Sequence, residues 1–427
     1  GAHGVLPVSV GNYKYNSGVC TQGNMRLQYT LPEMAGINSS VLAKIDDIAN
    51  FAIGSGATPS CQILVARNGK VCYEKSFGHF TYNPQTHSVE NSDIYDIASI
   101  TKITATLPLV MKLYEKDKIN LDQPIKNYYP FPEDCNKRYL NAREILLHQA
   151  GLAAWIPFYK STLDSYGFAS DEWYCPYYDS LYSIKIKDNL YLRNDFLDSI
   201  KQTIYNTSLG SKTYKYSDLG FYLMKDIVEY QLKDSLQNLA KQFLFSPMGM
   251  NHTLYNPKWN GVDLNTIVPT EQEQGFRNEL IHGTVHDMGA ALTNGIGGHA
   301  GLFSNTNDLA KYMQMLLNGG IYGGTRYLKT STINTFTSKQ ESGNRRGLGF
   351  DKPTGTNSGP TCASASSVSF GHSGFTGCLV WADPKYDLIY VFLSNRIYPT
   401  AENKKLISYD IRTKIQQVIY DAIQTPF

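Results

Sequence analysis

The sequence predicts an α/β protein of the α+β type, in which an antiparallel sheet flanked by helices adjoins a second, mostly helical lobe. Three features predict it. A helix pattern followed by a hairpin signal occupies residues 38–78, strands followed by a helix occupy 370–422, and a mostly helical pattern fills 121–320. The terminal segments are expected to form a sheet lobe at about 38–120 and 330–427, beside a helical lobe at about 121–329. The cleft between two lobes is a usual place for a binding site.

The N-terminal elements follow from short-range signals. Apolar residues recur at helical spacing from Val41 to Ala52, behind Asn38, which can cap the helix. Two strand-like runs then flank Asn68-Gly69, the strongest short hairpin signal, because both central residues of such a turn need a positive φ.

The C-terminal elements are predicted in the same way. The stretch "GHSGFTGCLVWADPKYDLIYVFLSN" has strand composition, with a turn at Asp383-Pro384. A final helix is expected because four apolar residues share one helical face: Ile411, Ile415, Val418 and Ala422.

Composition argues against several classes of function. The chain has 39 Lys and Arg against 37 Asp and Glu, a net charge of +2, so nothing favours nucleic-acid binding. No apolar run approaches the roughly 20 residues that span a bilayer. The seven cysteines are scattered without a Cys-x-x-Cys pair, so we expect no metal and no other cofactor, with room for one disulfide.

The tetrapeptide "SITK", residues 99–102, is the candidate nucleophile motif. In a helix that begins near Ser99, residues i and i+3 lie on one face about 5–6 Å apart. A Lys102 half-buried among isoleucines would lose its proton more easily and could then take the proton of Ser99. The alternative is a serine N-cap beside a solvated lysine.

Two further motifs could carry chemistry. Tyr216, in "TYKYSDLGFYLMKDIVEY", directly precedes an apparent helix; it could relay a proton, or it could be one unremarkable tyrosine among 31. In "SFGHSGFTG", His372-Ser373-Gly374 ends a predicted strand, where Gly374 would let a ligand approach the backbone and the Phe375 amide could face an oxyanion. The alternative for this motif is a glycine bulge on an edge strand.

In order and context, the three motifs resemble the Ser-x-x-Lys, Tyr-x-Asn and Lys-Thr-Gly motifs of the penicillin-recognising serine hydrolases. The resemblance is to the class C β-lactamase branch with its esterase and D-peptidase relatives. It extends from about residue 40 to 420 and includes "AREILLHQAGL", "FLFSPMGMNHTLYNP" and "GGHAGLFSNTNDLAKYMQMLLNGG". It implies the β-lactamase/transpeptidase fold.

The resemblance also implies a mechanism and a setting. Ser99 would attack a carbonyl, Lys102 and Tyr216 would share the proton transfers, and the backbone amides of Ser99 and Phe375 would form the oxyanion hole. The substrate would be an ester or amide, as in peptidoglycan fragments, and the location would be periplasmic or secreted in a bacterium.

Two departures from the family motifs bear on the substrate. Asp218 replaces an asparagine, so an amide donor becomes a carboxylate that only accepts when ionised. His372 replaces a lysine, so attraction of a substrate carboxylate is expected to fade as pH rises through about 6.5. Both favour an esterase or D-peptidase over an efficient β-lactamase. A true β-lactamase and a catalytically silent binding or sensor module are the alternatives, and the intact Ser99, Lys102 and Tyr216 argue against the silent one.

Other residues are candidates for the cleft wall. Trp155 and the aromatic segment 171–182 could line the substrate groove or pack within the lobe. We expect His148 to hold a loop by hydrogen bonds. His286 and His299 flank glycine-rich turns, where either could lie in the cleft.

The first residues carry a separate resemblance. They lack the charged and apolar regions of a signal peptide. The phrase "GVLPVSVG" resembles the C-terminal end of bacterial β-N-acetylglucosaminidases. Residues 1–20 are therefore interpreted as the remnant of an upstream glycosidase domain fused to the hydrolase domain at 21–427.

Overall fold

The computed structural model describes residues 26–340, 344–356 and 359–424. The predicted glycosidase remnant at 1–20 lies outside the described residues. All six cysteines of the described part are unpaired. Within the same ranges, every helix is too short or too polar to cross a bilayer.

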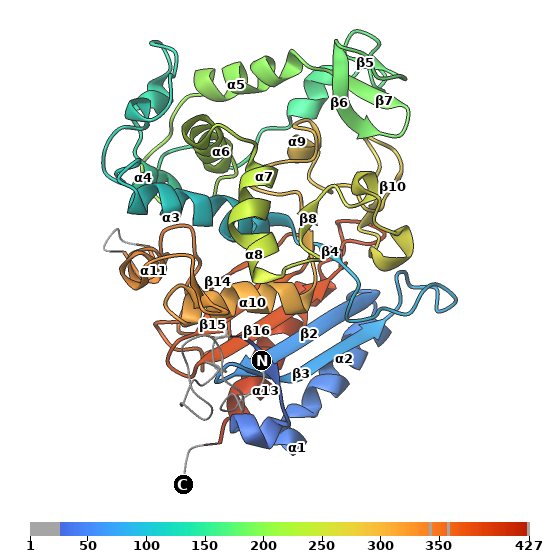
Figure 1. Cartoon of the computed structure of the whole chain (residues 1–427). Coiled ribbons are helices and arrows are strands. Elements are labelled where there is room, and N and C mark those ends of the chain that lie inside the picture. Colours follow the sequence, from blue (N-terminus) through green and yellow to red (C-terminus); the bar gives the residue numbers. More distant parts are fainter. Residues whose placement is uncertain (1–25, 341–343, 357–358, 425–427) are drawn as a thin grey trace, which may run out of the picture.

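A six-stranded sheet unites the two ends of the chain (Figure 1). The short edge strand β1 runs parallel to β3, and every other neighbouring pair is antiparallel. The predicted antiparallel sheet is therefore correct for five strands and misses β1, whose two residues are too few to show periodicity. In sheet order the strands are β1 (Gln28–Tyr29), β3 (Lys70–Gly78), β2 (Ser60–Arg67), β16 (Leu388–Ser394), β15 (Leu379–Asp383) and β14 (Phe370–Ser373).

The elements that short-range sequence signals predict are present in the structure. Asn68 and Gly69 have φ of 53° and 72°, and they join β2 to β3 as a tight hairpin. The Asn38 side chain accepts a hydrogen bond from the Val41 amide at 3.0 Å and caps α1 (Ser39–Leu42), after which α2 (Lys44–Gly54) continues the predicted helix. The predicted turn at Asp383-Pro384 separates β15 from β16.

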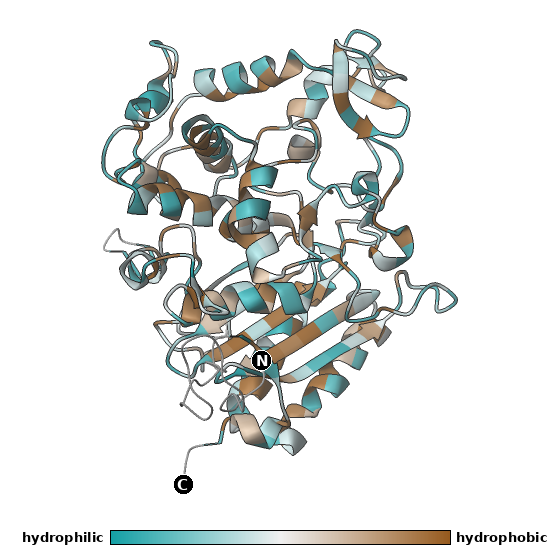
Figure 2. Cartoon of the chain, in the orientation of Figure 1, coloured by the Kyte–Doolittle hydropathy of each residue, from teal (hydrophilic) through white to brown (hydrophobic). Residues whose placement is uncertain are grey.

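Apolar cores cover both faces of the sheet. Along β2, Ile63 and Val65 face α2 and α13 (Ile411–Asp421), whereas Leu64 and Ala66 face the core that continues into the second lobe. Figure 2 shows apolar residues gathered on these central strands. Helix α10 (Thr306–Leu317) packs on the second face, against β2, β15 and β16. The sheet lobe therefore includes a helix on the far side of the expected boundary near 329.

The second lobe is helical but also holds a small sheet. Its helices include α4 (Ala142–Leu146), α5 (Phe196–Asn206), α6 (Leu219–Leu232), α7 (Leu236–Ala240), α8 (Ser246–Met248) and α9 (Met288–Ala291). The three-stranded sheet joins β5 (Tyr174–Cys175), β7 (Leu190–Arg193) and β6 (Tyr182–Lys187). The remaining elements are α3 (Leu107–Glu115), α11 (Thr330–Thr337), α12 (Lys405–Ser408), β4 (Tyr95–Asp96), β8 (Leu254–Tyr255), β9 (Glu271–Gln272), β10 (Leu280–Ile281), β11 (Leu302–Ser304), β12 (Ile321–Tyr322) and β13 (Thr325–Arg326).

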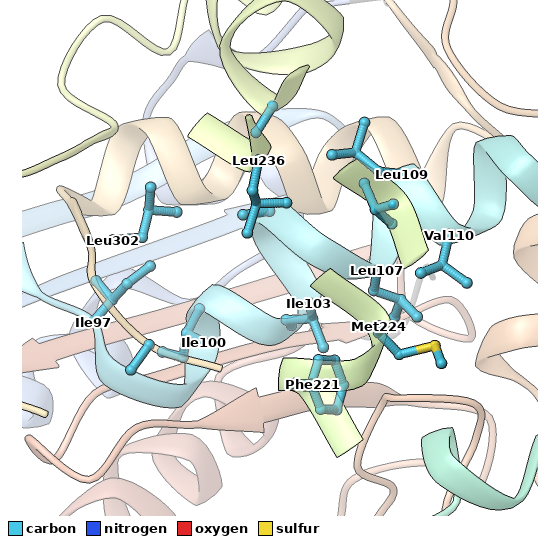
Figure 3. Packing of buried hydrophobic residues seen from close by; sticks show 14 of the residues in the cluster. Ile97, Ile100, Ile103, Leu107, Leu109, Val110, Phe221, Met224, Leu236 and Leu302 are labelled. Carbon is cyan, nitrogen blue, oxygen red and sulfur yellow. The ribbon is translucent and has the colours of Figure 1, made fainter. Parts of the chain in front are cut away.

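The segment from Ser99 to α3 lies in the interior between the lobes. Ile97, Ile100 and Ile103 are fully buried, and they belong to one apolar cluster with Phe221 and Met224 of α6 (Figure 3). This packing fixes the segment against the helical lobe and leaves polar side chains at the cleft in a defined position.

Candidate active site

A strained turn presents Ser99. The residue lies in a 3₁₀ turn, Ala98–Ile100, one residue after β4 and before a π-helical turn at Lys102–Thr106. Ala98 has a φ of 47°, a left-handed conformation that is uncommon for a residue with a Cβ. The Ala98 amide donates to Asp96 Oδ1 at 2.8 Å, which holds the turn. Strain and π-helical turns both recur at functional sites.

Three hydrogen bonds tie this segment to residues 298–302. The Leu302 amide donates to Thr101 Oγ1 at 3.1 Å, and Thr106 Oγ1 donates to the Gly298 carbonyl at 2.7 Å. Lys102 Nζ donates to the His299 carbonyl at 3.0 Å. The segment that carries Ser99 is thus held against residues 298–302.

Lys102 lies within hydrogen-bonding distance of Ser99, the predicted nucleophile. Its Nζ donates to Ser99 Oγ at 2.8 Å and forms an ion pair with Asp218 Oδ1 at 2.6 Å. Burial alone would lower the pKa of Lys102, but the Asp218 carboxylate and the Tyr216 phenol outweigh it and hold the pKa above its ordinary value. The expectation of a half-buried lysine that loses its proton easily is therefore wrong: Lys102 is fully buried and rests as an ammonium, because Asp218 is its counterion.

Tyr216 sits beside this ammonium. Lys102 Nζ lies 5.2 Å from the centroid of the Tyr216 ring, and the His148 ring packs on the tyrosine at 4.5 Å between centroids. The Ser217 amide donates to His148 Nδ1 at 3.1 Å, and the Lys215 amide donates to the His148 carbonyl at 2.8 Å. His148 therefore holds the Tyr216 loop, as predicted.

The end of β14 packs closely against the turn that contains Ser99. A Cβ on Gly374 would lie 2.5 Å from the Ile97 carbonyl oxygen, so only glycine permits this approach. The Phe375 carbonyl accepts from Arg396 Nη2 at 2.6 Å, while the Phe375 amide has no hydrogen-bond partner within the described ranges. This amide is free to donate to an oxyanion at Ser99.

His372 does not carry the charge that the sequence led us to expect. Its side chain is fully buried, and Nδ1 donates to the Ser373 carbonyl at 2.7 Å. Burial, together with the positive charges of Arg346 and Lys102, holds the pKa of His372 well below its ordinary value. The expected loss of carboxylate binding around pH 6.5 is therefore wrong, since this imidazole is already neutral there.

A cleft of about 980 Å³ contains the site. Most predicted site residues line it, namely Ser99, Trp155, Tyr216, Asp218, His299, His372, Ser373, Gly374 and Phe375, and Lys102 lies buried behind Ser99. His286 also lines it. None of the residues 171–182, all described, lines the cleft; Tyr177 and Tyr178 are exposed elsewhere.

Two histidine–carboxylate pairs form part of the wall. His299 Nε2 contacts Asp287 Oδ1 at 2.8 Å, and His286 Nε2 contacts Glu271 Oε2 at 2.5 Å. Burial alone would raise the pKa of Asp287, but contact with His299 lowers it. Both acids are engaged by their histidines, so neither offers a free carboxylate to the cleft.

Sequence reasoning missed Arg345, Arg346 and Asp351, which line the cleft from the loop after α11. They fall in no motif and lie far along the chain from Ser99. Two adjacent arginines before a glycine were the only signal, and such a pair is most often solvated.

Comparison with known proteins finds relatives that match over most of the chain. Proteins described as "Putative D-alanyl-D-alanine carboxypeptidase" from Escherichia coli K12 and Salmonella typhimurium LT2 are 30% and 29% identical over 399 residues, covering 88% of this chain and 87% of theirs. Among solved structures, a class C β-lactamase matches with a TM-score of 0.64 at 16% identity, over 91% of this chain and 98% of its own.

Two other solved structures have the same fold. EstCE1, a hydrolase with promiscuous acyltransferase activity, has a TM-score of 0.63 at 17% identity, over 89% of this chain and 99% of its own. A penicillin-binding protein homologue from Caulobacter crescentus has a TM-score of 0.63 at 15% identity, over 91% of this chain and 99% of its own.

Fold and site together define a serine hydrolase of the β-lactamase/transpeptidase type that works through an acyl-enzyme. The family model described as Beta-lactamase matches residues 42–412, so the chain belongs to that family.

Proposed function

We propose that this hydrolase cleaves the terminal D-alanyl amide bond of bacterial cell-wall peptides outside the cytoplasm. The hydrogen bond between Lys102 Nζ and Ser99 Oγ, at 2.8 Å beside a cleft large enough for a peptide, carries the assignment of the nucleophile. The D-alanyl substrate is supported by the names of the curated relatives.

The chemistry proceeds in two displacements. Ser99 Oγ bonds to the carbonyl carbon, and the amides of Ser99 and Phe375 stabilise the oxyanion. The bond from that carbon to the leaving nitrogen breaks once the nitrogen has received a proton. Water then cleaves the acyl ester and restores Ser99.

The proton transfers need a group that can accept the proton of Ser99. Because Lys102 rests as an ammonium, it must first release one proton to solvent. The neutral amine then accepts the proton of Ser99, and that proton is passed on to the leaving nitrogen. The carboxylate of Asp218, 2.6 Å from Lys102 Nζ, stabilises the ammonium and therefore opposes its release of a proton. Tyr216, whose ring centroid lies 5.2 Å from Lys102 Nζ, is the candidate to pass a proton to the leaving group.

A silent binding module is disfavoured because Ser99, Lys102 and Tyr216 are assembled at one point. An efficient β-lactamase is disfavoured by Asp218, which presents a carboxylate where the family motif has an amide donor.

The test compares the wild type with Ser99→Ala. The wild type should release D-alanine from an acyl-D-Ala-D-Ala peptide faster than it hydrolyses nitrocefin, and a fluorophosphonate should add one mass increment at Ser99. Ser99→Ala should lose both peptide cleavage and fluorophosphonate labelling, and its melting transition should be unchanged. Peptide turnover that survives in Ser99→Ala would disprove the nucleophile; labelling without peptide cleavage would disprove the substrate.

A further inference from the structure

Asp96 is a buried carboxylate to which the proposed reaction assigns no role. It ends β4, three residues before Ser99, and is 3% exposed. Oδ1 accepts from the Ala98 amide at 2.8 Å, and Oδ2 accepts from the His286 amide at 2.7 Å. Burial raises the pKa of Asp96, and these two hydrogen bonds oppose the rise. Since burying a carboxylate is costly unless it is hydrogen-bonded, the two bonds fix Asp96 and the two amides relative to each other.

The carboxylate is not needed to hold the strand in which it lies. The backbone of β4 pairs with β11, where Asp96 is opposite Phe303. Apolar residues bury the next turn, since Ile97 and Ile100 are fully buried. A side chain of another kind at position 96 would leave this pairing and this packing in place. The two hydrogen bonds of the carboxylate therefore serve the amides that they join.

The first of these bonds controls the direction of the Ser99 amide. Ala98 has a φ of 47°, and a residue with a Cβ keeps such a conformation only where its surroundings hold it. The bond from the Ala98 amide to Asp96 supplies that hold. Because the peptide between Ala98 and Ser99 is planar, the backbone angles of Ala98 determine where the Ser99 N–H points.

Another contact of Asp96 reaches the segment that carries the Phe375 amide. Thr376 Oγ1 donates to the Asp96 carbonyl at 2.8 Å, and Thr376 is 1% exposed. Thr376 directly follows Phe375, so this bond anchors the loop after β14 to the loop that precedes Ser99. The amides of Ser99 and Phe375 themselves have no hydrogen-bond partner within the described ranges, and both are free to donate.

The bond to His286 adds a third link to the same place. The His286 ring stacks on the Phe375 ring, with 5.7 Å between centroids and an angle of 19° between planes. Asp96 Oδ2 holds the backbone of His286, and His286 in turn limits the movement of Phe375. Three contacts of one residue therefore act on the two amides proposed to bind the oxyanion.

We propose that Asp96 is a positioning residue that sets the separation and direction of the Ser99 and Phe375 amides. The inference rests on the proposed function only in requiring acyl transfer at Ser99. Donors that already point at the developing charge lower the barrier because they need not reorient as the reaction proceeds. Disturbing Asp96 should therefore slow the formation of the oxyanion, and it should do so only for substrates whose oxygen uses both amides.

The experiment compares a p-nitrophenyl ester with the thionoester of the same acyl group, in which C=S replaces C=O. Sulfur is larger and accepts hydrogen bonds more weakly, so donors placed for oxygen serve it poorly. We expect the wild type to favour the ester in kcat/KM, after correction for the rates of the two compounds with hydroxide. Asp96→Asn keeps the shape but turns one acceptor into a donor that faces an amide N–H. It should lower kcat/KM for the ester by about 10- to 1,000-fold, the range for losing an oxyanion donor, and for the thionoester by less than about threefold.

A second variant and a matched control complete the series. Thr376→Val removes the hydroxyl that anchors the Phe375 side and should give the same selective loss on the ester, including where Asp96→Asn does not fold. Asp93 is the control, since it is 1% exposed and accepts the Glu90 amide at 2.8 Å but does not line the cleft. Asp93→Asn should leave the ratio of ester to thionoester within about twofold of the wild type.

Two results would overturn the proposal. One is an equal loss on both substrates in a variant of Asp96 or Thr376 that still melts cooperatively, because that would assign a purely structural role. The other is a ratio of ester to thionoester that does not differ from the wild type. An acyl-D-Ala-D-Ala peptide tests the proposed function separately: a selective loss on the ester, in an enzyme whose wild type does not cleave the peptide, would leave the role of Asp96 standing and reject the D-alanyl substrate.

Discussion

Replacing Asp218 with asparagine should move the pH dependence of acylation. The Asp218 carboxylate stabilises the fully buried Lys102 ammonium from 2.6 Å. Without that carboxylate, burial becomes the dominant influence and favours the neutral amine. If the neutral amine is the base for Ser99, activity rises with pH through the pKa of Lys102, and Asp218→Asn lowers that pKa. The acid limb of the pH profile must then move to lower pH.

The expected shift of the pH profile follows from the short distance between Asp218 and Lys102. An opposite charge within about 4–6 Å commonly alters a titration by about 1–3 units, and this pair is closer and shielded from water. We therefore expect the acid limb of kcat/KM to move down by about 1–3 pH units. On that limb the rate changes about tenfold for each pH unit, so Asp218→Asn should be the faster enzyme near pH 6 on a neutral ester.

The assay is kcat/KM for a neutral p-nitrophenyl ester between pH 5 and 9.5, for the wild type and for Asp218→Asn. Asp122→Asn is the matched control, since it removes the carboxylate of an exposed ion pair with Arg143 outside the cleft. The control profile should coincide with the wild type. A limb that stays in place in Asp218→Asn, while the protein remains folded, would refute the reasoning and assign the base role to Tyr216 alone.

Three other changes test separate parts of the site. Tyr216→Phe should lower the acylation rate by about 10²–10⁴ without altering the melting temperature, and loss of the melting transition would indicate a structural role instead. Gly374→Ala should separate β14 from the Ser99 turn, because its Cβ would lie 2.5 Å from the Ile97 carbonyl; we expect at least a tenfold slower fluorophosphonate labelling of Ser99, and labelling at the wild-type rate would contradict the close approach. For two thioesters that share an acyl group and release thioglycolate or thioglycolamide, the ratio of kcat/KM should stay flat from pH 5.5 to 8, since burial and the charges of Arg346 and Lys102 keep His372 neutral throughout; a decline centred near pH 6.5 would show that His372 carries the charge.

Features that depend only on residues close together along the chain could be predicted from the sequence. The positive φ values at Asn68 and Gly69, the cap at Asn38 and the spacing of Ser99 and Lys102 all depend on neighbours along the chain, and the structure contains each of them. The resemblance of three spaced motifs to a known family placed Tyr216 and the His372 motif in the same site. The fold class and the contact between Ser99 and Lys102 were therefore predictable from the sequence.

The charges of the site were decided by tertiary structure. The protonation of Lys102 depends on how deeply it is buried and on Asp218, which lies 116 positions further along the chain. The neutrality of His372 depends in the same way on burial and on the charges of the distant Arg346 and Lys102. A short motif determines which groups are present and how they are spaced. Their pKa values arise from desolvation and from Coulomb interactions across space, which only the packed chain defines.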